Sequence, residues 1–235
     1  MSDVSENLSI VRAKISAACV RSGRDISSVE LIAVSKTFST DDIRDAVRSG
    51  QVHFGESKLQ EAEPKIAESC GSLHWHFIGR VQRNKVRKLL NLFDVIHAVD
   101  SLRLASYANE IARESGWFPT AFLQVNIGGE LSKGGFELTD LREAMDQILK
   151  LDRLEIIGLM CIPPPAADPE SARVWFSKLR ETRDDLEHEF GVNLPSLSMG
   201  MSGDFEVAIE EGSTHVRVGS AIFGKRSYRI DGELG

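Results

Sequence analysis

Cysteine is scarce in this sequence, and long apolar runs are missing. The chain has 235 residues and three cysteines, which are far apart and form no CxxC pair: Cys19, Cys70 and Cys161. This usage predicts a reducing compartment and not a disulfide scaffold. No apolar stretch approaches the length of a membrane span, and the first residues lack the basic start and apolar centre of a signal peptide. We therefore expect a cytoplasmic protein without a membrane partner.

An excess of positive charge is also missing. The formal net charge is -7 at pH 7, which argues against nucleic acid as a partner because the phosphate backbone attracts basic surfaces. One stretch is locally basic, and we interpret it as a solvated helix face near an anion-binding mouth: Arg80, Arg83, Lys85, Arg87 and Lys88. No linker rich in Pro, Gly or Ser interrupts the chain, so residues 1–235 are expected to form one domain.

Short apolar runs alternate with helix-like segments along the chain. After an N-terminal helix at about 4–22, eight runs lie at 31–35, 52–54, 75–78, 95–98, 121–125, 156–160, 194–197 and 216–218. Buried strands that alternate with helices predict a parallel sheet, and eight strands close a TIM (β/α)8 barrel. We expect this barrel at about 29–226. An open doubly wound sheet is the competing architecture, although no GxGxxG follows the first run.

A lysine stands where the first apolar run ends. Lys36 follows the run at 31–35, at the strand end where α/β barrels place their reacting groups. Lysines usually lie on solvated faces, and desolvation at an apolar strand end favours the neutral amine. A neutral amine forms a Schiff base with an aldehyde. Lys36 is therefore the candidate for covalent binding of a carbonyl ligand.

Small residues follow the last two runs. Gly200, Ser202 and Gly203 stand after the seventh run, and Gly219 and Ser220 after the eighth. Barrels often hold a phosphate on these two loops, because small residues let backbone N–H groups approach the phosphate oxygens. Either loop alone is also consistent with an ordinary glycine turn. Together with the lysine across the barrel mouth, the two loops predict a phosphate-bearing aldehyde as the ligand.

Several stretches of the chain are characteristic of one known family. They are Ala33-Val34-Ser35-Lys36-Thr37, Phe54-Gly55-Glu56, His76-Phe77-Ile78-Gly79-Arg80-Val81-Gln82, Asn84-Lys85, Gly158-Leu159-Met160, Leu197-Ser198-Met199-Gly200-Met201-Ser202 and Val216-Arg217-Val218-Gly219-Ser220-Ala221-Ile222-Phe223-Gly224. With these stretches the chain resembles, over about 29–226, the YggS/PROSC family of pyridoxal 5'-phosphate (PLP) homeostasis proteins. The resemblance implies a PLP-binding barrel of fold type III, similar to the N-terminal domain of alanine racemase.

The resemblance also implies roles for individual residues. Lys36 matches the lysine that holds PLP as a Schiff base, and Arg217 matches the arginine that faces the pyridine nitrogen. An arginine there keeps this nitrogen unprotonated, because cationic groups in contact repel, and so weakens the ring as an electron sink. The rest of the implied cofactor-binding set is Ser57, Met199, Ser202, Gly203, Gly219 and Ser220, of which the last four match the phosphate cup. The family commonly has asparagine at the position of Ser57, whose hydroxyl has a shorter reach.

A second acid–base group is missing from the sequence pattern. Racemases that resemble this barrel use a tyrosine from a second, β-rich domain, and this chain ends shortly after the eighth run without one. Tyr107 and Tyr228 do not stand at strand ends, and racemisation needs proton donors and acceptors on opposite faces. We therefore predict no catalytic residue. The expected protein binds PLP and serves vitamin B6 homeostasis, and thereby amino-acid and keto-acid balance, without catalytic turnover.

Two enzymatic alternatives stay open. One is a small PLP-dependent racemase or lyase in which Cys161 replaces the tyrosine, although a small buried residue is the simpler interpretation of Cys161. The other is a class I aldolase-like barrel whose lysine attacks a sugar phosphate. Such enzymes usually carry that lysine on a later strand than the one that precedes Lys36.

Signals for a metal or a protein partner are weak. His74 and His76 would share one face of a strand, but no third ligand is spaced to join them, so we predict no metal site. Lys133 lies in a Gly-rich segment after the fifth run, and our hypothesis is that it contacts the ligand phosphate or receives the aldehyde during release. PLP-dependent apo-enzymes are candidate recipients. A monomer is expected because the racemase's dimer-forming second domain is missing.

Overall fold

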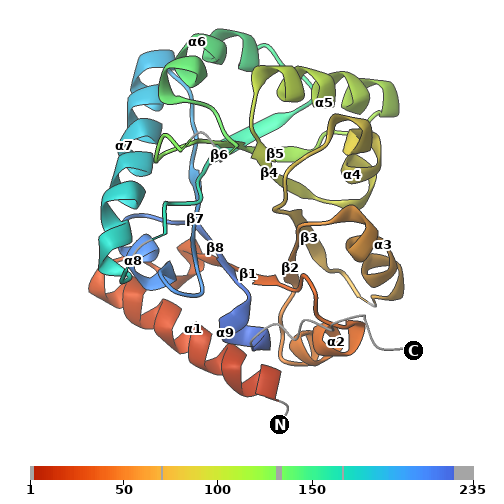
Figure 1. Cartoon of the computed structure of the whole chain (residues 1–235), viewed down its shortest axis with the longest axis vertical. Helices are drawn as coiled ribbons and strands as arrows, with labels where there is room; N and C mark the ends of the chain where they lie inside the picture. Colours follow the sequence, from red (N-terminus) through yellow and green to blue (C-terminus); the bar gives the residue numbers. More distant parts are fainter. Residues whose placement is uncertain (1–2, 70, 131–133, 166, 225–235) are drawn as a thin grey trace, which may run out of the picture.

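Eight parallel strands close into a barrel in the computed structural model of the chain, which describes residues 3–69, 71–130, 134–165 and 167–224 (Figure 1). The strands are β1 (Glu30–Val34), β2 (His53–Glu56), β3 (His74–Phe77), β4 (Val95–Val99), β5 (Thr120–Gln124), β6 (Glu155–Met160), β7 (Ser196–Met201) and β8 (His215–Val218). They follow one another in sequence order, and β1 pairs with both β2 and β8. The predicted barrel is confirmed, and its closure rules out the open doubly wound sheet.

Helices surround the barrel (Figure 1). In the described part of the chain they are α1 (Asp3–Arg21), α2 (Thr40–Arg48), α3 (Leu59–Glu68), α4 (Val86–Leu92), α5 (Leu102–Ser115), α6 (Leu138–Ile148), α7 (Arg173–Phe190), α8 (Phe205–Glu210) and α9 (Ser220–Phe223), with 3-10 segments at Ile26–Ser28, Arg83–Lys85 and Glu170–Ala172. Among the helices of these residues, none is both long enough and apolar enough to span a membrane.

The extra N-terminal helix α1 is confirmed, within one residue of its predicted bounds at each end. Its buried residues recur every three or four positions and form one apolar stripe: Val4, Leu8, Val11, Ile15, Ala18 and Cys19. The helix packs against α2, α8 and α9, and Figure 1 shows it as the red helix along the lower edge of the barrel. The start of the chain is thereby fixed beside its last described helices.

Local capping signals set several helix ends. The Ser101 hydroxyl accepts a hydrogen bond from the Leu104 amide at the start of α5, and Gly116 ends this helix with φ +71. Ser39 and Asp42 form a capping box at the start of α2. Both arrangements satisfy helix-terminal groups that would otherwise have no partner. These boundaries therefore follow from a few neighbouring residues.

The seventh strand lies farther along the chain than the predicted 194–197. Leu194 is buried ahead of the strand, so its apolar side chain contributes to the core without belonging to β7. The pairing with β8 shifts register between Ser198 and Met201, where Gly200 has φ +92. A Cβ on Gly200 would lie 2.6 Å from the Cβ of Ala208 in α8. Glycine therefore permits both this irregular backbone and the close packing of α8.

Imidazole rings fill part of the barrel interior. The ring of His97 in β4 stacks on Phe122 of β5 at 4.5 Å and lies 6.1 Å from the ring of His215 in β8. Since β4 and β8 are not neighbours, this contact crosses the interior, where barrels of this class usually hold branched aliphatic side chains. Burial lowers the pKa of His97 and His76 well below the ordinary value, and lowers that of His215 to about 4. The interior is therefore polar but uncharged at these rings near pH 7.

Candidate functional site

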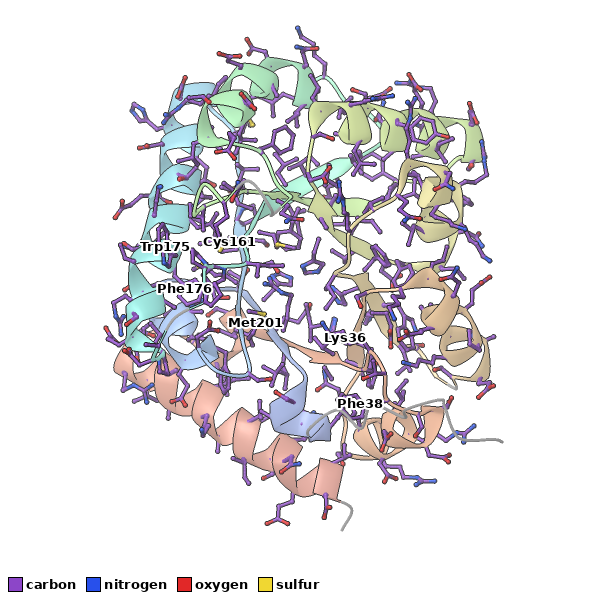
Figure 2. All side chains as sticks on the ribbon, in the orientation of Figure 1. Lys36, Phe38, Cys161, Trp175, Phe176 and Met201 are labelled. Atoms are coloured by element: carbon purple, nitrogen blue, oxygen red, sulfur yellow. The ribbon has the colours of Figure 1, made fainter. Side chains whose placement is uncertain are left out.

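A pocket of about 220 Å³ opens where β1, β7 and β8 end. It brings together six of the predicted site residues: Lys36, Ser202, Gly203, Arg217, Gly219 and Ser220. These residues come from opposite ends of the sequence and meet because β1 and β8 are paired, with Ala33 opposite Val218. In Figure 2, Lys36 and Met201 lie around the barrel mouth, and Phe38 lies toward α2 and α9.

A buried ion pair lies next to the chain segment that carries Lys36. The Lys65 ammonium of α3 donates to Oε1 of Glu56 at 2.7 Å and to the Ser35 carbonyl at 2.8 Å. The Ser35 hydroxyl donates to the same Glu56 oxygen at 2.7 Å. The side chains of Ser35 and Glu56 are fully buried. Main chain and side chain of the residue before Lys36 are therefore both fixed.

Burial dominates the electrostatics of this ion pair. It raises the pKa of Glu56 above the ordinary value, although the ammonium of Lys65 and the hydroxyl of Ser35 act in the opposite direction. The other carboxylate oxygen of Glu56, Oε2, is buried without a hydrogen-bond partner among the described residues. Burying two charges costs desolvation energy even when they are paired. The arrangement therefore serves the position of Ser35 and Lys36 more than the stability of the fold.

The backbone turns into the left-handed region immediately after Lys36. Thr37 has φ +71, and no other non-glycine residue of the described ranges has a positive φ. This conformation costs an L-residue about 1–2 kcal/mol, and β-branched residues rarely adopt it. The Thr37 amide donates to Oε2 of Glu61 at 3.3 Å. Local strain therefore accompanies the placement of the lysine.

Arg217 is a buried cation in the pocket wall. Its guanidinium donates to the Ser198 hydroxyl at 2.5 Å and to the Cys161 carbonyl at 2.9 Å. Burial lowers the pKa of Arg217, but a guanidinium stays protonated in proteins. Neither of these acceptors is an anion, although the Asp204 carboxylate acts on the guanidinium through space and opposes the lowering of its pKa.

The loops after β7 and β8 are tied together by one hydroxyl. Ser202 Oγ accepts hydrogen bonds from the amides of Gly219, at 3.1 Å, and Ala221, at 3.3 Å. The backbone amides of Gly203 and Ser220 have no hydrogen-bond acceptor in the described parts of the chain. A Cβ built on Gly203 would meet nothing within 4 Å. The two amides and the open space at Gly203 fit the phosphate of PLP, and Lys36 in the same pocket fits its aldehyde.

Two predicted residues lie outside this pocket. Met199 is fully buried in β7, and its carbonyl accepts a hydrogen bond from the Ser213 hydroxyl at 2.7 Å. Ser57 lines a neighbouring hollow together with Arg80 and Lys85. Their contact with a ligand stays a prediction. Lys133 lies outside the described residues.

Sequence reasoning missed five lining residues and the support beneath the lysine. The five are Val34, Phe38, Ile78, Met201 and Gly224, most of which are apolar and carry no chemical signal. Phe38 stacks on Phe223 with ring centroids 5.1 Å apart, a contact between distant segments that no local pattern indicates. A signal did exist for Glu56, because a carboxylate next to an apolar strand needs a buried partner.

Comparisons with known proteins agree with this geometry. Residues 8–227 match the family described as "Alanine racemase, N-terminal domain". A protein of Aquifex aeolicus (strain VF5) named pyridoxal phosphate homeostasis protein is 44% identical over 95% of this chain and 98% of its own length. The chain belongs to the pyridoxal phosphate homeostasis protein family. A relative of the same name from Pseudomonas aeruginosa is 43% identical over 97% of this chain and 98% of its own.

A solved structure of a similar protein contains PLP. PipY of Synechococcus elongatus PCC7942, solved with PLP bound, is 38% identical to this chain, with a TM-score of 0.84. The match covers 94% of this chain and 100% of PipY. The family resemblance and the PLP-binding barrel predicted from the sequence are both confirmed.

Proposed function

We propose that this protein holds PLP covalently through Lys36 and takes part in intracellular PLP homeostasis without catalytic turnover. The observation that carries the proposal is the single pocket in which Lys36, Arg217 and the small residues of two loops converge. PLP supplies an aldehyde that condenses with a primary amine and a ring that accepts electrons. The amine of Lys36 would bind the aldehyde and the guanidinium of Arg217 would face the pyridine nitrogen. The amides of Gly203 and Ser220 would bind the phosphate.

Arg217 supports a holding role over catalysis. Its charge is fixed by Ser198 and Cys161, and a permanent cation beside the pyridine nitrogen opposes protonation of that nitrogen. An unprotonated ring is a weaker electron sink. The residue therefore disfavours those reactions of a bound amino acid that depend on the ring as an electron sink.

The composition of the pocket wall supports the same role. Among its described lining residues, only Lys36 and Arg217 are ionisable. Cys161, the alternative acid, is fully buried, and its carbonyl is used to hold Arg217. Racemisation requires proton transfer on two faces of the substrate, and this wall supplies one candidate. The racemase or lyase alternative would need an acid from another source.

The decisive experiment follows the visible absorbance of the Schiff base. Purified protein with PLP should show this absorbance, and Lys36→Ala should abolish it. Lys150→Ala, at an exposed lysine, is the matched control and should behave as the wild type. Absorbance that survives in Lys36→Ala would disprove the assignment of the lysine.

A second experiment separates the holding role from catalysis. The PLP-loaded protein is incubated with a panel of amino acids and assayed for racemised, decarboxylated and transaminated products. We expect turnover at the background rate of free PLP, whereas fast turnover would establish the enzymatic alternative. Transfer of PLP from the loaded protein to an apo-enzyme tests whether such enzymes are partners. Light scattering tests whether the protein is a monomer.

A further inference from the structure

The histidines of this chain are concentrated in the barrel strands. Of its six histidines, His53, His74, His76, His97 and His215 lie in β2, β3, β4 and β8, and His188 lies in α7. The pocket around Lys36 uses none of the five strand histidines. Several of them gather instead with Glu30 at the start of β1, at the opposite end of the barrel.

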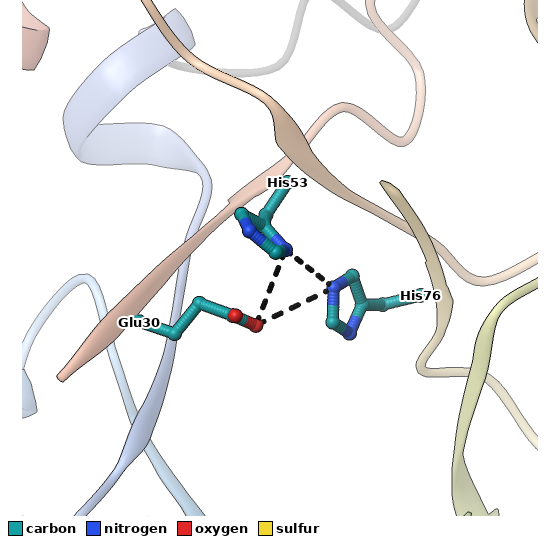
Figure 3. A group of neighbouring side chains, drawn as sticks. All are labelled: Glu30, His53 and His76. Atoms are coloured by element: carbon teal, nitrogen blue, oxygen red, sulfur yellow. Dashed lines mark hydrogen bonds and ion pairs between the residues drawn. The ribbon is translucent and has the colours of Figure 1, made fainter. Parts of the chain in front are cut away.

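Three side chains of this cluster direct metal-binding atoms at one another (Figure 3). Nδ1 of His53 lies 3.1 Å from Nε2 of His76 and 3.3 Å from Oε1 of Glu30. Nε2 of His76 lies 3.5 Å from the same oxygen. In a tetrahedral zinc site with bonds of about 2.0–2.1 Å, neighbouring ligand atoms are about 3.3–3.4 Å apart. The three observed separations surround this value.

We propose that Glu30, His53 and His76 bind one divalent transition-metal ion of the zinc class. Two imidazoles and one carboxylate form a ligand set known for zinc, with the fourth position left to water. The site would join β1, β2 and β3, three neighbouring strands, at the end of the barrel where they begin. This inference does not depend on the proposed function.

The carboxylate oxygen at the centre of the cluster supports the proposal. Glu30 Oε1 is buried and has no hydrogen-bond partner among the described residues. A buried acceptor without a partner is destabilising, and a cation between Glu30, His53 and His76 would satisfy it. Nε2 of His215 also lies 3.5 Å from this oxygen, so a fourth strand, β8, reaches the same point.

The outer ring nitrogen of His76 has a partner of the kind expected around a metal. Nδ1 of His76 lies 3.0 Å from Nε2 of His97. A metal-binding histidine almost always donates its other ring N–H to a neighbour, which orients the ring. His97 in turn lies 2.8 Å from the Ser198 hydroxyl. The ring of His76 is therefore oriented by a hydrogen-bonded chain through His97 to Ser198 inside the barrel.

An ion can reach this cluster from solvent. The side chains of Glu30 and His53 are 30% and 25% exposed, whereas that of His76 is 2% exposed. Two ligands thus stand at the rim and one lies inside. Glu30 begins β1 and Lys36 follows the end of this strand, and none of the three ligands lines the pocket around Lys36, so the cluster and the PLP pocket are separate.

The test titrates the metal-free, full-length protein with Zn²⁺ alone, and with Co²⁺ as a spectroscopic probe. We expect one Zn²⁺ per chain, visible Co²⁺ bands of a four-coordinate site, and a melting temperature that rises with Zn²⁺ concentration. The absence of Zn²⁺ uptake would show that the cluster is held by hydrogen bonds only and would overturn the proposal.

Variants identify the ligands. Glu30→Gln and His53→Gln change rim residues and should each weaken Zn²⁺ binding at least about tenfold, with the melting temperature no longer responding to Zn²⁺. His188→Gln, at an exposed histidine of α7, is the matched control and should bind as the wild type. Binding that survives both rim substitutions, or that is lost in His188→Gln, contradicts the site. Circular dichroism and PLP binding at the other end of the barrel verify that each variant is folded.

Discussion

Lys65 and Glu56 form a buried ion pair, with Nζ and Oε1 2.7 Å apart, and the same ammonium holds the carbonyl of Ser35 at 2.8 Å. The pair connects α3 to the ends of β1 and β2. Because Lys36 follows Ser35, an ion pair outside the pocket helps to fix the position of the Lys36 backbone.

Lys65→Met should strongly destabilise the protein. The substitution leaves the Glu56 carboxylate buried without its cation, for which a loss of about 3–5 kcal/mol in the free energy of unfolding is expected. Lys58→Met is the control, because Lys58 is exposed and solvent screening makes such a surface pair contribute far less to stability. Urea unfolding measures both. Equal losses in the two variants would contradict the structural role of the buried pair.

Glu56→Gln should change how stability depends on pH. Burial raises the pKa of Glu56 above its ordinary value of 4.5, so the folded state keeps this proton to a higher pH than the unfolded state. The stability contribution is therefore complete below pH 4.5 and is lost as pH rises through the folded-state pKa. Urea unfolding at a series of pH values should show that wild type loses stability relative to Glu56→Gln over this window. A constant difference between them would refute the pKa direction.

Ser202→Ala should weaken PLP binding. The substitution removes the acceptor shared by the Gly219 and Ala221 amides, and a neutral hydrogen bond contributes about 1 kcal/mol, or roughly a fivefold change in affinity. Fluorescence or absorbance titration with PLP measures the effect. Ser177→Ala in α7 removes a serine hydroxyl that contacts Arg180 and Glu181 and should leave PLP affinity unchanged.

Ser198→Ala should alter the environment of the bound PLP ring. Arg217 would lose one of its two hydrogen-bond acceptors, which costs about 1–3 kcal/mol in the free energy of unfolding and loosens the cation beside the ligand. We expect a shifted visible absorbance in the PLP-loaded variant. Ser213→Ala, at another fully buried serine, should lose stability without a spectral shift, so a shift in both variants would count against a specific role for Ser198.

Thr37→Asn should stabilise the protein by up to about 1 kcal/mol, because asparagine adopts a positive φ more readily than a β-branched residue. Thr37→Val keeps the branch and should give no such gain. Thermal and urea unfolding compare the two variants. A gain with valine as large as that with asparagine would show that the conformation of Thr37 carries no strain.

Most of the barrel could be predicted because its signals are local. Each strand except β7 lies within two residues of an apolar run, and Ser101 and Gly116 delimit α5 as their capping chemistry requires. The prediction placed β7 too early because Leu194 is a buried apolar residue that precedes the strand. The strand itself continues through Gly200, which has no side chain and so adds nothing to the apolar pattern. A bulge depends on the partner strand, which the local pattern does not contain.

The pocket could be predicted from strand ends at Lys36 and at the small residues after β7 and β8, whereas Arg217 was expected only from the family resemblance. The Glu56–Lys65 pair required knowing that α3 lies over β1 and β2. The histidine cluster was missed for a related reason, since sequence spacing joined His74 to His76 within one strand. The structure instead brings His76 to His53 and Glu30 across three strands, a relation set by sheet register.

The pairing of β1 with β8 has a consequence for synthesis of the protein. Lys36 is synthesised before Arg217, so the nascent chain carries one part of the pocket while the strands between these residues are still being made. The pocket is therefore incomplete until β8 pairs with β1. A chain that lacks β8 would also lack Arg217, Gly219 and Ser220, and so would lack the wall of the pocket that these residues form with Lys36.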